Sequence, residues 1–251
     1  MSPVETAFGA FSEDYERYRP GYPDALWDLL ALPERARVAD LGAGTGRASR
    51  AAAARGYRVT AVEPDPEMAQ VARTRNTRDG VKIGVVEAPA EQTGLGAASQ
   101  DAVIAAQAYH WFEIPAANQE IWRILKPGGC FAAFWNDRQV EGTPWLEAFE
   151  RLIVQYNPSH SRDYRKFDVE ARIQDGARYS EIESHAMPHA FPIDLEGFVG
   201  LARTFSYIRG VLHPSDLVRF EGELRDLLTD AHGEEDFEVP FVLNVTVARR
   251  V

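Results

Sequence analysis

In this chain of 251 residues, the first candidate for a ligand-binding site is the glycine-rich stretch 40–46. Glycines at positions 42, 44 and 46 let a backbone turn tightly and approach a ligand with no Cβ in the way. Glu63 follows Asp40 by 23 residues (63 − 40 = 23), close to the ~20-residue offset of a carboxylate that binds ribose hydroxyls. The pattern predicts a site for a ligand that contains a nucleoside.

A glycine-rich turn alone could hold a nicotinamide, a flavin or S-adenosylmethionine. The dinucleotide pattern G-x-G-x-x-G would need its third glycine at position 47, where this chain has Arg47. The chain has G-x-G-x-G instead, preceded by Asp40, whose carboxylate can face the ammonium group of S-adenosylmethionine directly or through water. The spacing therefore favours S-adenosylmethionine over a nicotinamide cofactor.

Two side chains are candidates for catalysis. His110 follows an apolar segment, and the ordinary pKa of histidine suits a general base near neutral pH; the alternative is a histidine that only shapes the pocket floor. Tyr207, with Arg209, lies in a stretch that could line a pocket for the acceptor of a transferred group, as could residues 135–138. Packing within the core is the alternative for these aromatic residues.

The N-terminal segment 11–22 is rich in aromatic residues and arginine. We expect it to fold over the cofactor as a lid, with Tyr15 and Arg19 as cofactor-binding residues. Arg19 would then pair with a carboxylate of the cofactor or the substrate. The alternative is a surface charge on an amphipathic helix.

Strand and helix patterns alternate through the first half of the chain. Strands are predicted over residues 37–41, 57–62, 81–86, 101–106 and 130–135, and helices over 46–55, 66–76 and 114–125. Residues 126–129, Lys-Pro-Gly-Gly, are predicted to close the last of these helices as a turn. The alternation predicts βαβ units in a Rossmann-like, doubly wound and mostly parallel sheet, with ligands beyond the carboxyl ends of the strands.

The second half has a different pattern. We predict a helical insertion over 137–175, strands over 179–191 and 237–249 that form an antiparallel edge, and helices over 194–203 and 214–231. The whole chain, 1–251, is predicted to be a single domain. Its parts would be an N-terminal lid segment (1–30), a cofactor-binding core (37–136), the insertion, and the C-terminal strands and helices (176–251).

Composition excludes several functions. The formal net charge of −11 argues against nucleic acid and anionic membranes as partners, because both attract positive surfaces. One cysteine, Cys130, excludes an intrachain disulfide and a multi-cysteine metal site. The histidines show no ligand spacing, so no metal is predicted. With no apolar segment typical of a signal peptide or a membrane helix, we expect a cytoplasmic protein, as a monomer or homodimer.

Five motifs together resemble one family. They are V-A-D-L-G-A-G-T-G-R, V-E-P-D, A-E-Q-T-G-L, D-A-V-I-A-A-Q-A-Y-H-W-F and R-I-L-K-P-G-G. The chain resembles class I S-adenosylmethionine-dependent methyltransferases over about residues 8–136. It is most similar to the small-molecule branch that includes trans-aconitate and ubiquinone-type methyltransferases.

The resemblance implies a role for each matching residue. The methionine part of the cofactor would contact Gly42, Ala43 and Gly44. The nucleoside would be held by four residues: Glu63 on the ribose hydroxyls, Pro64 beside the adenine, and Ala90 and Glu91 at the adenine edge. Gln107 would lie beside the sulfonium.

The activity that the resemblance implies is transfer of a methyl group to a small-molecule acceptor, at an O, N or C atom that the sequence leaves open. Two alternatives stay open at this point. One is a protein of this fold that uses the bound cofactor for another purpose. The other is a nicotinamide-dependent oxidoreductase.

Overall fold

The computed structural model describes residues 16–162, 168–174 and 179–251. The chain divides into two compact units. The first takes in the described parts of Met1–Pro20, Asp137–Lys166 and Pro188–Val242, and the second takes in those of Gly21–Asn136, Phe167–Met187 and Leu243–Val251. Our single-domain prediction for 1–251 is not tested by this division and stays a prediction.

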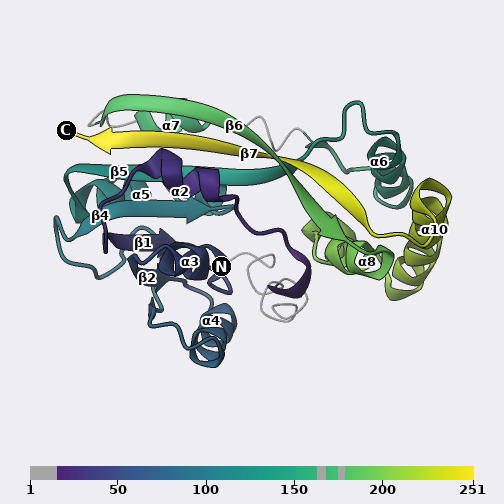
Figure 1. Ribbon diagram of the computed structural model, residues 1–251, viewed down its shortest axis with the longest axis horizontal. Coiled ribbons are helices and arrows are strands. Elements are labelled where there is room, and N and C mark those ends of the chain that lie inside the picture. The colour runs from purple at the N-terminus through teal and green to yellow at the C-terminus, as the bar shows by residue number, and fades with distance from the viewer. Residues whose placement is uncertain (1–15, 163–167, 175–178) are drawn as a thin grey trace. The chain divides into compact units, whose positions relative to one another are not determined.

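A seven-stranded sheet has the order β3-β2-β1-β4-β5-β7-β6. Its strands are β1 (Arg37–Leu41), β2 (Arg58–Val62), β3 (Gly84–Val86), β4 (Gln100–Ala106), β5 (Leu125–Arg138), β6 (Tyr179–Ile193) and β7 (Phe237–Arg250). The pairs among β1 to β5 are parallel, whereas β7 runs in the opposite direction (Figure 1). The predicted fold class, a Rossmann-like sheet with an antiparallel C-terminal edge, is confirmed.

The second unit buries both faces of the sheet. Val38 and Ile104 pack on one face with helices α2 (Asp24–Leu30) and α3 (Arg47–Ala54). Their neighbours Ala39 and Val103 pack on the other face with α5 (Ile114–Ile124) and α7 (Val169–Gln174). Successive side chains of a strand point to opposite faces, so a strand covered on both sides is apolar throughout. This explains why β1 and β4 appear in the sequence as short apolar runs.

Helix α4 (Pro66–Arg78) follows β2 and begins where the sequence predicts it. Pro66 occupies the first turn, where its missing N–H has no intrahelical partner to lose. The side chain of Asp65 caps the helix by accepting hydrogen bonds from the backbone N–H groups of Glu67 and Met68. The cap fixes the path of the chain directly after Glu63, which matters for the site below.

The first unit has its own aromatic core. Its helices are α6 (Pro144–Tyr156), α8 (Leu195–Arg203), α9 (Ser206–Arg209) and α10 (Pro214–His232). Phe149, Phe198 and Phe220 are buried between them. Within the predicted insertion 137–175, the described residues 137–162 belong to this unit and residues 168–174 belong to the other; the insertion itself stays a prediction.

The predicted turn at residues 126–129 is wrong, because these residues belong to β5. The pairing with β4 is irregular here: Gln100 lies opposite Leu125, and Ala102 opposite Cys130. A Cβ on Gly129 would lie 2.9 Å from two backbone oxygens. The glycines therefore allow a bulge within the strand where sequence reasoning expects its boundary. The third strand is also shorter than predicted, at Gly84–Val86.

Candidate cofactor site

The glycine-rich turn joins β1 to α3, and all three of its glycines have positive φ: +64° at Gly42, +57° at Gly44 and +81° at Gly46. A Cβ on Gly42 would lie 2.7 Å from the Cβ of Ala108, so this glycine is required by contacts within the protein. A Cβ on Gly44 would meet only Met68, at 3.7 Å. Gly44 is therefore the position at which the missing side chain leaves room for a ligand.

Glu63 comes directly after β2 and carries a buried carboxylate. Its Oε2 accepts a 2.6 Å hydrogen bond from the backbone N–H of Gly44, and its Oε1 accepts one of 3.0 Å from that of Asp65. Burial raises the pKa of this carboxyl, and the two backbone donors oppose the rise. Each carboxylate oxygen retains a second acceptor position, so Glu63 can bind ligand hydroxyls without losing its backbone partners.

Asp40, at the end of β1, is fully buried. Its Oδ2 accepts a 2.6 Å hydrogen bond from the hydroxyl of Ser49 on α3. Among the described residues, Oδ1 has no hydrogen-bond partner. Burial raises the pKa of this carboxyl to about 7; the hydrogen bonds from the side chain and the backbone of Ser49 oppose the rise and the charge of Glu63 adds to it. Within the described ranges, Asp40 is thus an acid with one orphaned oxygen and no ion pair.

The strand ends bring further predicted residues to this edge of the sheet. The N–H of Ala43 donates to the carbonyl of Val62, which ties the turn to the end of β2. Gln107 follows β4 with a φ of +60°, a left-handed conformation that is uncommon for a residue with a side chain, and its N–H donates to the carbonyl of Phe134. Gln107 precedes Ala108, the residue in contact with the Gly42 turn.

The residues predicted to contact adenine differ in exposure. Pro64 is exposed next to Glu63, and Ala90 is buried in the core of the second unit. Glu91 is half-buried, and its Oε1 accepts a 2.8 Å hydrogen bond from the N–H of Glu113. The structure places these residues in the loops that follow β2 and β3; their contacts with a cofactor remain predictions.

His110 lies on a short 3₁₀ helix after β4, Tyr109–Trp111. Its Nδ1 accepts a 3.1 Å hydrogen bond from the indole N–H of Trp135. Desolvation by the surrounding protein lowers the pKa of the ring to about 4, so the ring is neutral at pH 7. Because indole N–H only donates, the proton of the neutral ring is on Nε2, and that nitrogen can only donate.

The two aromatic neighbours of His110 differ in environment. Tyr109 is fully buried and donates to Asn118, so it belongs to the core. Trp111 is 54% exposed, and its ring centroid is 4.7 Å from that of His110. An exposed tryptophan beyond the carboxyl end of a parallel strand is available to contact a ligand.

Three predicted residues belong to the first unit or fall outside the described residues. Arg19 donates to the hydroxyl and the carbonyl oxygen of Thr204, at 2.8 and 3.0 Å. Tyr207 accepts a 3.0 Å hydrogen bond from Arg138, and its ring lies 4.3 Å from that of His160. Tyr15 lies outside the described residues. The roles proposed for all three stay predictions.

Sequence reasoning missed three contributors to the site. Asp65 holds Glu63 through its N–H, and the N-cap position before Pro66 was a signal for it. Ser49 is the hydrogen-bond partner of Asp40, and nothing in the sequence distinguishes it from other helical serines. Trp135 was expected to line a pocket; its hydrogen bond to His110 depends on the pairing of β4 with β5.

No group of three or more His, Cys, Asp or Glu side chains among the described residues could hold a metal ion. No helix in the described ranges is both long enough and apolar enough to cross a bilayer.

Comparisons with known proteins agree with this geometry. The methyltransferase domain family model matches residues 39–133. An uncharacterised methyltransferase-like protein of Schizosaccharomyces pombe is 31% identical over 203 residues, which are 78% of this chain and 75% of that protein. The chain belongs to the class I S-adenosylmethionine-dependent methyltransferase family.

Two further similarities are informative. An uncharacterised methyltransferase of Mycobacterium tuberculosis is 39% identical over 150 residues. The match spans 60% of this chain and 60% of the length of that relative. A solved structure from Anaeromyxobacter dehalogenans, described as a type II methyltransferase, has a TM-score of 0.70 and 26% identity and covers 92% of this chain and 98% of its own.

Proposed function

We propose that this protein transfers a methyl group from S-adenosylmethionine to a small-molecule acceptor. The observation that carries the proposal is the pair formed by Glu63 and the Gly44 N–H. It puts a buried carboxylate at the end of β2 against the one glycine of the turn that leaves room for a ligand. A carboxylate accepts hydrogen bonds from both hydroxyls of a ribose, as in other nucleoside sites of parallel sheets.

The residues fit the remaining parts of this cofactor. The orphaned Oδ1 of Asp40 can accept from the ammonium group of the methionine moiety, directly or through water. A cation there would favour the ionised form of Asp40 and lower its raised pKa. The backbone N–H groups at the start of α3 lie in the same turn and favour the carboxylate of that moiety.

The cofactor supplies a sulfonium that is already a strong methyl donor. The protein's contribution is then to hold the acceptor in line and to exclude water. Gln107 and His110, both after β4, lie at the edge where ligands of such sheets bind. We assign His110 the role of a neutral donor that orients an oxygen or nitrogen of the acceptor through Nε2–H, in place of the general base that its residue type favours.

We infer a small, partly apolar acceptor. Trp111 is exposed beside His110 and can cover an apolar part of such a molecule. The net charge of −11 disfavours nucleic acid. The residues after β5 and Tyr207 remain our candidates for the rest of the acceptor pocket, and a cytoplasmic monomer or homodimer remains our expectation.

Calorimetry with S-adenosylhomocysteine tests the cofactor assignment. The Glu63→Gln variant should bind more weakly by roughly 1.5–3 kcal/mol, because it loses charge-assisted acceptors for the ribose hydroxyls. Glu67→Gln, an exposed glutamate of α4, is the matched control and should bind like the wild type. Equal affinity in the Glu63 variant would remove this residue from the proposed site.

The role of His110 is tested by two substitutions with different donors. His110→Gln keeps an N–H near the position of Nε2 and should retain turnover within about tenfold of the wild type, whereas His110→Ala should lose about 10²-fold or more. Cofactor affinity should stay nearly constant in both variants. If glutamine were as inactive as alanine, with activity depending on a single ionisation, a general base would be the better account.

The acceptor assay also separates methyl transfer from another use of the cofactor. The protein would be incubated with S-adenosylmethionine and a panel of small acids, phenols and amines. Mass spectrometry should find a product heavier by one methylene group. Cofactor binding without any methylated product across a broad panel would favour the alternative of a non-methylating role.

A further inference from the structure

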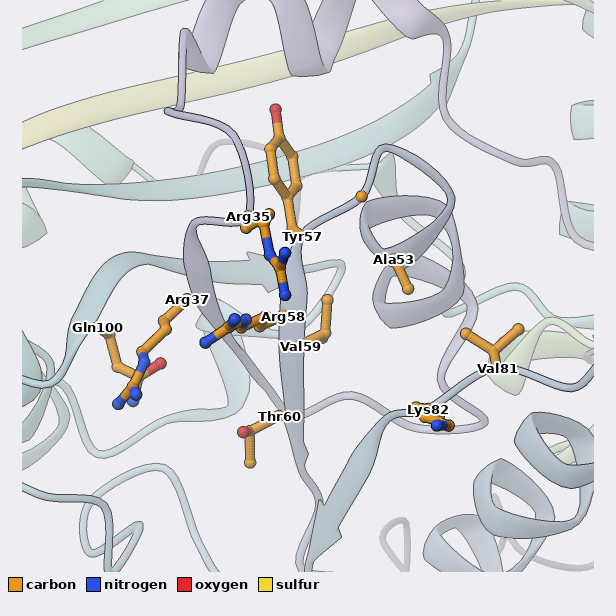
Figure 2. A pocket seen from close by; sticks show the side chains of 11 residues that line it. Arg35, Arg37, Ala53, Tyr57, Arg58, Val59, Thr60, Val81, Lys82 and Gln100 are labelled. Carbon is orange, nitrogen blue, oxygen red and sulfur yellow. The ribbon is translucent and has the colours of Figure 1, made fainter.

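A hollow of about 590 Å³ lies in the second unit, away from the glycine-rich turn. It is lined by residues at the amino ends of β1 and β2 and before β3: Arg35, Arg37, Ala53, Gly56, Tyr57, Arg58, Val59, Thr60, Val81, Lys82 and Gln100. Three arginines and a lysine are among them, and no acid is. In Figure 2 the Arg35, Arg37 and Arg58 side chains gather beside β2, with Lys82 on its other side.

The basic character of this hollow contrasts with the rest of the protein, whose net charge is −11. Several arginines elsewhere form ion pairs: Arg55 with Asp28, Arg73 with Glu87, and Arg123, Arg203 and Arg225 with glutamates. Among the described residues, the side chains of Arg35, Arg58 and Lys82 form no ion pair. Like charges gathered without counter-ions repel one another, so an anion would be bound favourably there.

Asp101, an acid beside Arg37 of the hollow, already has partners. The carboxylate of Asp101 accepts a 2.8 Å hydrogen bond from the backbone N–H of Arg37 and forms a 2.5 Å ion pair with Lys126. These partners, together with the charge of Arg37, outweigh burial and lower the pKa of Asp101. Asp101 therefore offsets part of the Arg37 charge and leaves the other three cations uncompensated.

The backbone conformation of Arg35, one of the residues that line the hollow, is unusual. Arg35 has a φ of +58° in the turn closed by the hydrogen bond from the Ala36 N–H to the Pro33 carbonyl. The third position of a turn with positive φ favours glycine or asparagine, and a side chain there is destabilising by roughly 1 kcal/mol or more. Arg35 therefore reaches the hollow from a turn position at which glycine would be more stable.

We propose that this hollow binds a small anion with two or more phosphate groups. Guanidinium groups donate in pairs to phosphate oxygens, and lysine adds a point charge. The volume lies within the 300–1,000 Å³ range typical of small-molecule sites and exceeds what one phosphate needs. Because the cofactor residues follow the carboxyl ends of β1 and β2, the anion and the cofactor occupy opposite ends of the same strands.

Isothermal calorimetry with inorganic pyrophosphate, at an ionic strength held constant with sodium chloride, tests the proposal. The wild type should bind one pyrophosphate, and saturating S-adenosylhomocysteine should not displace it. Arg35→Gln and Arg58→Gln should each weaken binding about tenfold, the effect of losing one charge-assisted contact. Arg151→Gln, an exposed arginine of the first unit, removes the same charge elsewhere and should change nothing.

Three results would overturn the proposal. They are an absence of pyrophosphate binding to the wild type, equal weakening by the Arg151 control, and displacement by S-adenosylhomocysteine, which would mean that the anion occupies the glycine-rich turn. Thermal unfolding of the ligand-free variants checks that they are folded. Because both substituted side chains are exposed, we expect unfolding temperatures close to that of the wild type. The outcome is independent of the proposed methyl transfer, since no acceptor or methyl donor takes part in the measurement.

Discussion

The two units each bury a charged side chain, and they treat it in opposite ways. Arg138 of the first unit is 4% exposed. It donates to Glu150 at 2.7 Å and to Tyr207 at 3.0 Å, and its guanidinium lies 4.4 Å from the ring centroid of Phe205. Burial lowers its pKa, but Tyr207 and Glu150 outweigh burial and raise it. Both of these hydrogen bonds come from Nη2, and the buried Nε has no hydrogen-bond partner among the described residues.

Asp40 of the second unit is buried just as deeply but has no counter-ion among the described residues. It accepts hydrogen bonds from the hydroxyl and the backbone of Ser49, and the nearby charge that affects it is that of Glu63, of the same sign. A buried charge that has a counter-ion within the protein has a structural role, since removing one member of the pair leaves the other buried and unpaired. A buried acid with an orphaned oxygen indicates instead where a ligand should supply the missing cation or donor.

The largest effect on stability is expected at Arg138, whose buried charge has a counter-ion. Arg138→Met should lower the free energy of unfolding by about 3–5 kcal/mol, because Glu150 would remain largely buried without its ion pair. Urea denaturation measures the loss. Arg151→Met, an exposed position on α6, is the control and should stay within about 0.5 kcal/mol of the wild type. A similar loss in both variants would mean that the Arg138 network is not specific.

Asp40→Asn should instead raise the free energy of unfolding of the ligand-free protein. The folded-state pKa is about 7 against an ordinary 3.8, so between these values the unfolded chain has released a proton that the folded chain retains. Stability therefore falls as pH rises from about 4 to 7. The penalty is largest above pH 7, at roughly 3–4 kcal/mol. Asparagine removes this penalty and can still accept from Ser49.

Denaturation at several pH values tests this prediction, and the variant should show a flatter dependence than the wild type. Calorimetry adds the ligand side of the comparison. Affinity for S-adenosylhomocysteine should rise with pH through about 7 in the wild type, as Asp40 ionises, and stay constant and lower in the variant. A variant that binds as tightly as the wild type would show that Asp40 does not face the ammonium group.

The smallest effects are expected from alanine substitutions at Gly42 and Gly44, two glycines of the same turn. Alanine at Gly44 must adopt a positive φ, which is destabilising by roughly 1–2 kcal/mol, and its Cβ occupies the side open to a ligand. Alanine at Gly42 has the same strain and in addition a contact of 2.7 Å with Ala108. Gly44→Ala should therefore reduce cofactor affinity more, and Gly42→Ala should reduce thermal stability more. The reverse order would exchange the roles of the two glycines.

The glycine spacing, Asp40 and Glu63 pointed to the cofactor class that the family implies, and they predicted a candidate site beyond the ends of β1 and β2. Such local patterns are readable because a tight turn before a helix needs glycine whatever surrounds it. Strand boundaries were less predictable. The Lys126–Gly129 bulge depends on how β5 pairs with β4. The sequence of one strand does not specify the register in which a partner strand pairs with it.

The protonation state of His110, on which its proposed role depends, could not be predicted from the sequence either. Its residue type indicated a base, but the tautomer depends on the indole of Trp135, 25 residues away (135 − 110 = 25), and the pKa depends on desolvation by the fold. The basic hollow has the same origin, since Arg35, Arg58 and Lys82 are scattered in the sequence and line one hollow only in the folded chain.

Residue order alone was enough for the class of fold, the methyltransferase family and the net negative charge, because these follow from local periodicity, turn chemistry and summed charge. Burial, protonation and the pairing of distant side chains needed the folded chain. Each of these depends on how much water and which neighbours surround an atom, and those surroundings are assembled from segments that the sequence keeps far apart.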